Sequence, residues 1–280
     1  MPLVFWPMIE RYITGCAVED PLLELPAQTR ERLKDCFPRG ATRRMTQLGM
    51  LVGSVLRSLK PEESSALVYA TRFAENQALE EYLASFPTPS PTLFQTSIHP
   101  SAVQQVLIAR QQPIRELFPL TGNAQLGAHS LQMALLAPGP RVILCGGEER
   151  GTWLREHGSA SEETFAFAVG LSHAAAGSIG KLSFNADTKA SEASATQALD
   201  PVGQDGDIQG ATRFAAPTGS NAWVAERSER FVPVRGQATK DGWTGGRGAL
   251  SLRELFDIVR DRRGLKRELS IGGILEISWL

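Results

Sequence analysis

The stretch Leu120–His129, LTGNAQLGAH, crowds small residues into a turn and then continues as an apolar segment. Crowding of this kind is typical of a tight turn that leads from a strand into a helix and can present a nucleophile at the helix N-terminus. No Cys or Ser stands at the apex of this turn. Two interpretations are therefore open: a nucleophile turn that lacks its nucleophile, or a turn that carries no chemistry.

The segments on either side of this turn predict a strand, a helix and a second strand. IRELFPLT (114–121) is expected to be extended, and LGAHSLQMALLA (126–137) is expected to be a helix that ends at the following PGP. RVILCGGEE (141–149) is a short apolar run that ends in two glycines, which predicts a buried strand.

The same alternation extends over the rest of the chain. Apolar periodicity predicts helices over 25–59, split at FPRG, and over 74–86, 101–112 and 250–264. Further strands are predicted over 65–72, 163–172, 180–186 and 270–280. Ser251 is a candidate N-cap, because Glu254 follows it by three residues. Strands that alternate with helices indicate an α/β fold with layered elements.

The composition changes after residue 184. From Asn185 to Ser220 the chain is rich in small and polar residues and has few large apolar ones, which predicts a loop or partly disordered insertion. We therefore divide the chain into an N-terminal domain at 1–184, an insertion at 185–222, and a C-terminal helix and strand at 223–280 that complete the domain.

The composition excludes several classes of function. The 280 residues are 42% hydrophobic and 21% charged with a formal net charge of −1, which gives no basic face for nucleic acid. No segment is long and apolar enough to predict a membrane span, and the N-terminal apolar run lacks the features of a signal peptide. The three cysteines have no CxxC spacing, so we expect reduced thiols, no metal site and a cytoplasmic location.

The order of parts from Ser97 to Glu149 resembles the central segment of β-ketoacyl synthases in the thiolase-like superfamily. In that family a loop and a helix precede an extended segment, a Thr-Ala-Cys-Ala-x-Gly turn, a buried helix and a strand that ends in a Gly pair before an acid. The counterparts here are Ser97–Arg110, Phe118–Thr121, Asn123–Gly127, Ala128–Ala137 and LCGGEE. The resemblance covers roughly residues 25 to 175 and implies the N-terminal half of a thiolase-like layered fold, with an abbreviated C-terminal part.

The resemblance places Ala124 where the family keeps its nucleophilic Cys, three residues before Gly127. A thiolate at a helix N-terminus is activated by the unpaired amides and the helix dipole, whereas an Ala methyl has no lone pair. A register shift of one residue would place Gln125 there, which cannot be acylated either. The family's condensing members also use two His from the latter half of the chain, and no His follows His173 here. We therefore expect no catalytic residue at this turn.

The segment LPAQTRERLKDCFPRGATRRMTQLGML (25–51) is similar to the N-terminal signature of short synthase-like subunits called chain length factors, of the aryl polyene type. This resemblance implies a heterodimer with an active β-ketoacyl-ACP synthase, contact with an acyl carrier protein through that complex, and no cofactor. It also implies that Phe118–Thr121 runs antiparallel to a partner strand, and that His129 lies near a subunit contact. The expected tunnel and interface residues are Phe94, Gln95, Ile98, Gln104, Phe118, Leu120, Thr121 and Asn123.

Two other functions remain open from the sequence. The chain could be an independent acyl-thioester enzyme that uses the hydroxyls of Ser97 or Ser130, or Glu148 and Glu149 at a strand end. No Gly-x-Ser-x-Gly elbow is present, and GWTGGRG (242–248) lacks the spacing of a phosphate-binding loop. The chain could also be a homodimeric acyl-binding protein of the same fold.

Overall fold

The computed structural model describes residues 8–186, 249–269 and 273–280. Most of the insertion expected at 185–222, and the Gly-rich segment at 242–248, lie outside these residues. Within them, eight strands form one mixed sheet in the order β3-β2-β4-β5-β1-β6-β8-β7. The expected α/β class is confirmed.

The strands differ in direction along this sheet. Its first three strands, β3, β2 and β4, are parallel to one another, whereas the remaining pairs are antiparallel. The strands are β1 (Ile9–Glu19), β2 (Ala66–Ala70), β3 (Glu116–Leu120), β4 (Arg141–Glu148), β5 (Phe165–Ser172), β6 (Gly180–Asn185), β7 (Leu265–Glu268) and β8 (Ile274–Trp279). The carboxyl ends of the three parallel strands lie at the same end of the sheet, next to the turn that begins at Thr121.

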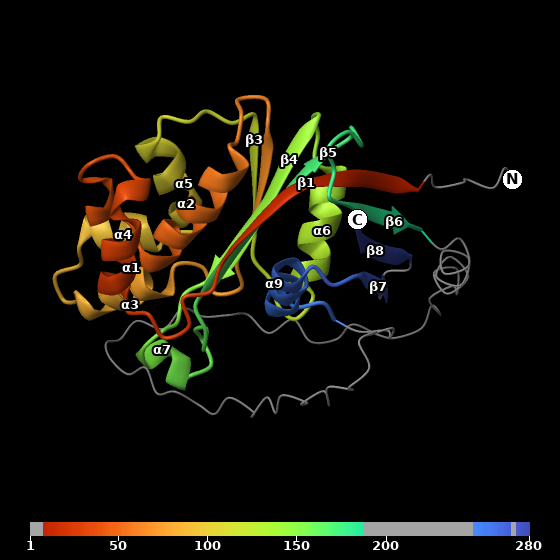
Figure 1. The fold of residues 1–280 in the computed structure, drawn as a ribbon. Helices are drawn as coiled ribbons and strands as arrows, with labels where there is room; N and C mark the ends of the chain where they lie inside the picture. Colours follow the sequence, from red (N-terminus) through yellow and green to blue (C-terminus); the bar gives the residue numbers. More distant parts are fainter. Residues whose placement is uncertain (1–7, 187–248, 270–272) are drawn as a thin grey trace, which may run out of the picture.

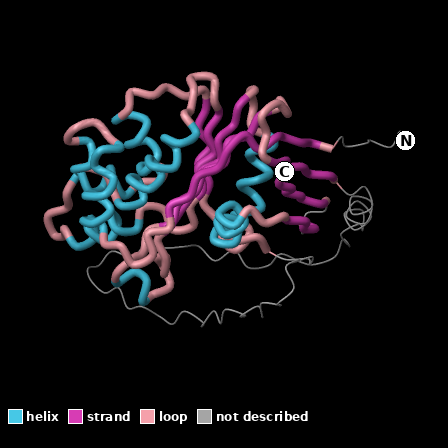
Figure 2. The backbone as a smooth tube through the Cα atoms, viewed as in Figure 1, coloured by secondary structure: helices cyan, strands magenta, loops and turns pink. Residues whose placement is uncertain are grey.

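Helices cover both faces of the sheet (Figures 1 and 2). One face carries α1 (Pro26–Leu33), α2 (Gln47–Leu59), α3 (Asn76–Ala84), α4 (Pro91–Ser97) and α5 (Ser101–Ala109), with short 3₁₀ segments η1 (Lys34–Cys36) and η2 (Ala41–Arg43). The other face carries α6 (Leu126–Leu136) and α9 (Leu252–Asp261). The short α7 (Trp153–Glu156) lies beyond the end of β4.

Side-chain alternation along the central strands builds a separate core on each face. On β4, Val142 and Leu144 pack toward α6 and α9, while Ile143 and Cys145 pack toward α2 and α5. The strand β5 alternates in the same way, with Phe167 in the first core and Ala168 in the second. Because successive strand residues point to opposite faces, a strand that is buried on both sides is apolar throughout. The continuous apolar runs in the sequence predicted β4 and β5 for this reason.

The structure adds elements that the sequence did not predict. Strand β1 pairs with both β5 and β6 in the middle of the sheet, and its core face contains Arg11, which is only 2% exposed. A buried Arg interrupts the apolar alternation by which strands are recognised, which explains the omission. Helix α4 and strand β7 were also not predicted, and both are short. By contrast, Ser251 caps α9 as expected, since its side chain accepts the N–H of Glu254.

Candidate functional site

A pocket of about 360 Å³ lies at the carboxyl ends of the parallel strands, where ligand sites of α/β sheets commonly form. The loop after β2, the turn after β3, the end of β4, the segment after α7 and the start of α9 contribute its walls. The residues that matter for its chemistry are Arg72, Phe73, Asn123, Ala124, Glu148, Arg155 and Arg253. The turn singled out in the sequence therefore borders a real cavity.

Local hydrogen bonds shape the turn between β3 and α6. The side-chain Oδ1 of Asn123 accepts the N–H of Gln125 at 3.2 Å, and the carbonyl of Asn123 accepts the N–H of Leu126 at 3.1 Å. Helix α6 starts at Leu126, so Ala124 lies two residues before the first residue of the helix. A Cβ on Gly127 would stand 2.5 Å from the carbonyl oxygen of Ser251, so only glycine permits the close approach of α6 to that segment.

Ala124 is exposed and lines this pocket. Its methyl group can neither attack a thioester nor transfer a proton. Among the described residues, the walls of this pocket contain no Cys and no His.

Three arginines give the pocket a charged lining that the sequence did not reveal. Arg155 pairs with Glu162 at 2.9 Å, and Arg253 pairs with Glu163 at 3.3 Å. The charge of Arg72 acts to lower the pKa of the neighbouring Glu148, and its guanidinium carbon lies 4.6 Å from the centre of the Phe73 ring. Arg72 lies two residues after the end of β2, and ligand sites of α/β sheets commonly form beyond the carboxyl ends of such strands.

The two glutamates at the end of β4 are bound to backbone amides. Glu148 accepts the N–H groups of Arg72 and Phe73, and Glu149 accepts those of Leu48 and Gln77 at the starts of α2 and α3. Burial raises the pKa of each carboxyl to about 7, although these hydrogen bonds act in the opposite direction. Both side chains hold the loop after β2 and two helix ends in place, which is a structural role.

The residues expected to line a tunnel fall into two groups. Phe94 and Gln95 lie on α4, Ile98 follows it, and Gln104 lies on α5. Phe94 and Ile98 expose about half of their surface, at 49% and 48%.

The second group belongs to the edge strand and the turn. Phe118 and Leu120 lie on β3 and are half-buried, and Thr121 and Asn123 follow the strand and are exposed. Of all eight residues, Asn123 alone borders the pocket at Ala124. The other seven remain a prediction for an assembled complex.

The hydroxyls considered for an independent enzyme are engaged within their own helices. Ser97 donates to the carbonyl of Phe94 at 2.9 Å, and Ser130 donates to the carbonyl of Gly127 at 3.0 Å. Ser130 lies inside α6 and is fully buried. Bonds of this kind to a carbonyl of the preceding turn are common for helical serines and indicate no activation.

His99 stacks on Tyr69 with ring centroids 5.1 Å apart, whereas His129 is exposed on α6. Neither lines the pocket at Ala124.

In the described ranges, no three His, Cys, Asp or Glu side chains gather as metal ligands would. No helix within the same ranges combines the length and apolar character needed to cross a membrane.

No protein-family model and no curated protein matches the sequence. Among solved structures, a ketosynthase in complex with its chain length factor from Xenorhabdus doucetiae is 20% identical with a TM-score of 0.44, and the match covers 63% of this chain and 83% of that chain. A β-ketoacyl synthase from Burkholderia phymatum is 12% identical with a TM-score of 0.45, covering 64% of this chain and 64% of that one. The ishigamide ketosynthase/chain length factor is 11% identical with a TM-score of 0.36, and the match covers 59% of each chain.

These proteins are of the classes that the sequence resembles. The chain spans less than two thirds of the length of the second and third of them.

Proposed function

We propose that the chain is a catalytically silent, ketosynthase-like chain length factor of the aryl polyene type. In this proposal it forms a heterodimer with an active β-ketoacyl-ACP synthase, meets the acyl carrier protein through that complex, and forms one wall of the acyl tunnel. The partner's Cys carries the growing chain, and the wall supplied here limits its length. No cofactor takes part.

The observation that carries this proposal is the turn at Ala124. The strand, the turn, the helix N-terminus and the adjoining pocket are all present, but the residue at the apex is an alanine. A fold element that would position a nucleophile has thus been kept while the nucleophile is missing. A subunit that shapes a site, and leaves the chemistry to its partner, accounts for both facts.

The free edge of the sheet supports the heterodimer. Strand β3 pairs with β2 on one side, and no strand of the described residues pairs with its other side. Its apolar side chains are only half-buried, including Leu117, Phe118 and Leu120. An unpaired apolar edge is a liability for a free subunit, and pairing with a partner strand would cover it.

Pro119 restricts how a partner strand can pair with this edge. The carbonyl of Leu120 accepts the N–H of Thr71 and so faces β2, which turns the backbone groups of Pro119 toward the free edge. Proline has no N–H to donate, so the edge offers the N–H of Leu117 and the carbonyls of Leu117 and Pro119. We infer that side-chain burial around Phe118 contributes most of the interface.

The test is co-expression with the ketosynthase from the same genome, followed by size-exclusion chromatography with light scattering. We expect a stable 1:1 complex that buries more than about 1,000 Å². A chain that stays monomeric with and without that ketosynthase contradicts the proposal. A homodimer that persists in the presence of the ketosynthase would instead favour the homodimeric acyl-binding protein, because a second copy could also cover β3.

A further inference from the structure

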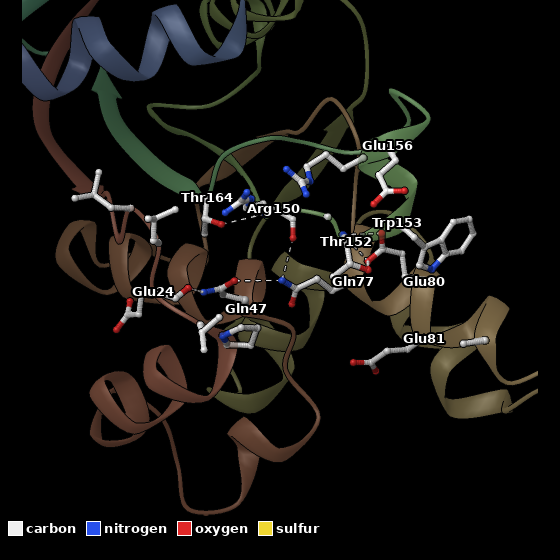
Figure 3. Close-up of a pocket in the computed structure, with 17 residues that line it drawn as sticks. Glu24, Gln47, Gln77, Glu80, Glu81, Arg150, Thr152, Trp153, Glu156 and Thr164 are labelled. Carbon is white, nitrogen blue, oxygen red and sulfur yellow. Dashed lines mark hydrogen bonds between the residues drawn. The ribbon is translucent and has the colours of Figure 1, made fainter.

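A groove of about 780 Å³ lies between the loop before α1, helix α3 and helix α7 (Figure 3). Among the described residues, only Arg155 lines both this groove and the pocket at Ala124. Helix α3 borders the groove with one face, because Gln77, Glu81 and Ala84 follow one another at helical spacing. The proposed function makes no use of this groove.

Exposed apolar side chains form the mouth of the groove. Leu22, Leu23 and Leu25 precede α1 and are 72%, 77% and 63% exposed, and Trp153 on α7 is 42% exposed. Single apolar side chains on a surface need no explanation, but several that gather around a hollow are typical of a surface that binds another molecule. An apolar groove of this kind can accept the apolar face of a helix.

Hydrogen bonds from buried side chains hold both sides of the groove in place. The carbonyl of Glu24, in the leucine loop, accepts the side-chain amide of Gln47 at 2.9 Å. On the opposite side, the Glu80 carboxylate accepts the N–H groups of Thr152 and Leu154 at the start of α7. The groove is therefore ordered before a partner arrives, which lowers the entropy cost of binding.

The charged side chains that line the groove are four carboxylates and two guanidiniums, namely Glu24, Glu80, Glu81, Glu156, Arg150 and Arg155. Two of them are paired with residues outside the groove. Glu24 pairs with Arg32 at 2.9 Å, and Arg155 pairs with Glu162 at 2.9 Å. Three carboxylates and one guanidinium then remain, so the groove has an excess of two negative charges.

The unpaired carboxylates lie on the two helices that flank the groove. Glu80 is 5% exposed, and its hydrogen bonds come from neutral groups, so no cation neutralises it. Glu81 on α3 and Glu156 on α7 are exposed, and neither has an ion pair within the described residues. A partner with cationic side chains beside an apolar stripe would therefore complement both the charge and the apolar surface of the groove.

We propose that this groove docks a basic amphipathic helix of a partner protein. The apolar face of that helix packs against Leu22, Leu23 and Trp153, and its Lys or Arg side chains lie beside Glu81 and Glu156. The inference goes beyond the proposed function, because no residue of β3, the proposed pairing edge, lines the groove.

The test is a titration of the full chain against the fluorescein-labelled peptide KLAKLAKKLAKLAK, followed by fluorescence anisotropy. As a helix, this peptide has leucines and alanines on one face and lysines on the other. ELAELAEELAELAE keeps the apolar face with the opposite charge, and a scrambled lysine peptide of the same composition has no apolar face. We expect saturable 1:1 binding of the first peptide and at least about tenfold weaker binding of the other two.

Leu23→Ser should weaken binding of the lysine peptide by about tenfold, because an apolar side chain is no longer buried against it. Ile108→Ser is the matched control, since Ile108 is 76% exposed and does not line the groove, and it should leave the affinity within about twofold. Circular dichroism checks that each variant is folded. If Leu23→Ser does not fold, Trp153→Ala tests the same apolar surface.

The combined change Glu81→Gln and Glu156→Gln should weaken binding by about fivefold, because two exposed ion pairs with the peptide are lost. Its control is Glu63→Gln with Glu276→Gln, which changes the net charge equally at exposed residues outside the groove. The control should leave the affinity within about twofold.

Three results would overturn the proposal: no saturable binding of the lysine peptide, equal or tighter binding of the glutamate peptide, or an equal loss of affinity in the two pairs of Glu variants. The last result would show a general attraction of charge and no docking in the groove. A dimer of the native chain that Leu23→Ser dissociates would also overturn it, because a second copy would then cover the groove. Each measurement uses this chain alone and does not depend on ketosynthase pairing.

Discussion

The Oε2 atom of Glu75 lies 3.9 Å from Nδ1 of His99, and neither atom has a hydrogen-bond partner among the described residues. The other oxygen of Glu75 accepts the N–H of Ala102 at the start of α5. Burial raises the pKa of Glu75 to about 8, with a further increase from the nearby Glu149 and Glu148, and burial lowers the pKa of His99 to about 4. At neutral pH, the carboxyl is therefore largely protonated and the imidazole is uncharged.

This pair predicts that stability decreases with rising pH above neutrality. In the unfolded chain Glu75 loses its proton near pH 4.5, whereas in the native state it keeps the proton up to about pH 8. Its contribution to the free energy of unfolding is therefore complete below pH 4.5 and is lost as the pH rises to 8. His99 acts with the opposite sign between about pH 4 and 6.5 and no longer contributes above that range.

We expect the free energy of unfolding, from urea titrations, to fall between pH 6.5 and 8, with a slope of at most about 1.4 kcal/mol per pH unit from this one group. Glu75→Gln keeps an acceptor for Ala102 and cannot ionise, so its slope should be smaller. An equal slope in the native chain and in Glu75→Gln would show that other groups, such as Glu148 and Glu149, determine how the free energy of unfolding depends on pH.

Arg11 is predicted to stabilise the end of α6. Its guanidinium donates to the carbonyls of Leu135, Ala137 and Gly139, at 3.2, 2.5 and 3.2 Å. Arg11→Met fills similar space but leaves these acceptors without their donors, so we expect a loss of about 2–4 kcal/mol in the free energy of unfolding. Arg57→Met, at an exposed residue of α2, is the control and should change it by less than about 0.5 kcal/mol.

Gly127→Ala should weaken the contact between α6 and the segment that leads into α9. The added methyl would lie 2.5 Å from the Ser251 carbonyl oxygen and 2.8 Å from that of Leu250, and backbone atoms cannot move aside cheaply. We expect a destabilisation of about 1–3 kcal/mol by urea unfolding. In the control Gly122→Ala, the nearest atom is a Leu126 methyl at 3.3 Å, so a similar loss there would contradict this explanation.

Ala124→Cys should not create an independent condensing enzyme. The new thiol would stand before the N-terminus of α6, but no His of the described residues lines the pocket to assist proton transfer. We expect condensation by the co-expressed pair to remain dependent on the partner's Cys. Product formation after removal of the partner's Cys would contradict the silent-subunit proposal.

Phe118→Ala should disturb pairing or shift product length, because Phe118 is half-buried on the free edge strand. The measurements are the dissociation constant of the complex and the chain-length distribution of its products. Phe86→Ala, which removes a ring that is 55% exposed away from β3, is the matched control. If both variants behave alike, β3 is not the interface.

The sequence by itself determined the elements whose side chains follow a regular period. Strands β2, β4 and β5 are apolar because both of their faces are buried, and α2 is apolar over most of its length because it packs between the sheet and helices α1 and α5. The strand, turn and helix around Ala124, and the Ser251 cap, depend on contacts between near neighbours in the chain. Local patterns of this kind are visible without a structure.

Only the tertiary structure decided which distant segments meet. The central position of β1 depends on pairing with β5 and β6, more than one hundred residues away, and its buried Arg11 conceals the strand pattern. The charged lining near Ala124 joins Arg72, Arg155 and Arg253 from three separate segments, and Arg150 lines one cavity with leucines that precede α1. Such sites arise from backbone pairing and packing across the whole sheet, and local residue order does not encode which side chains these contacts bring together.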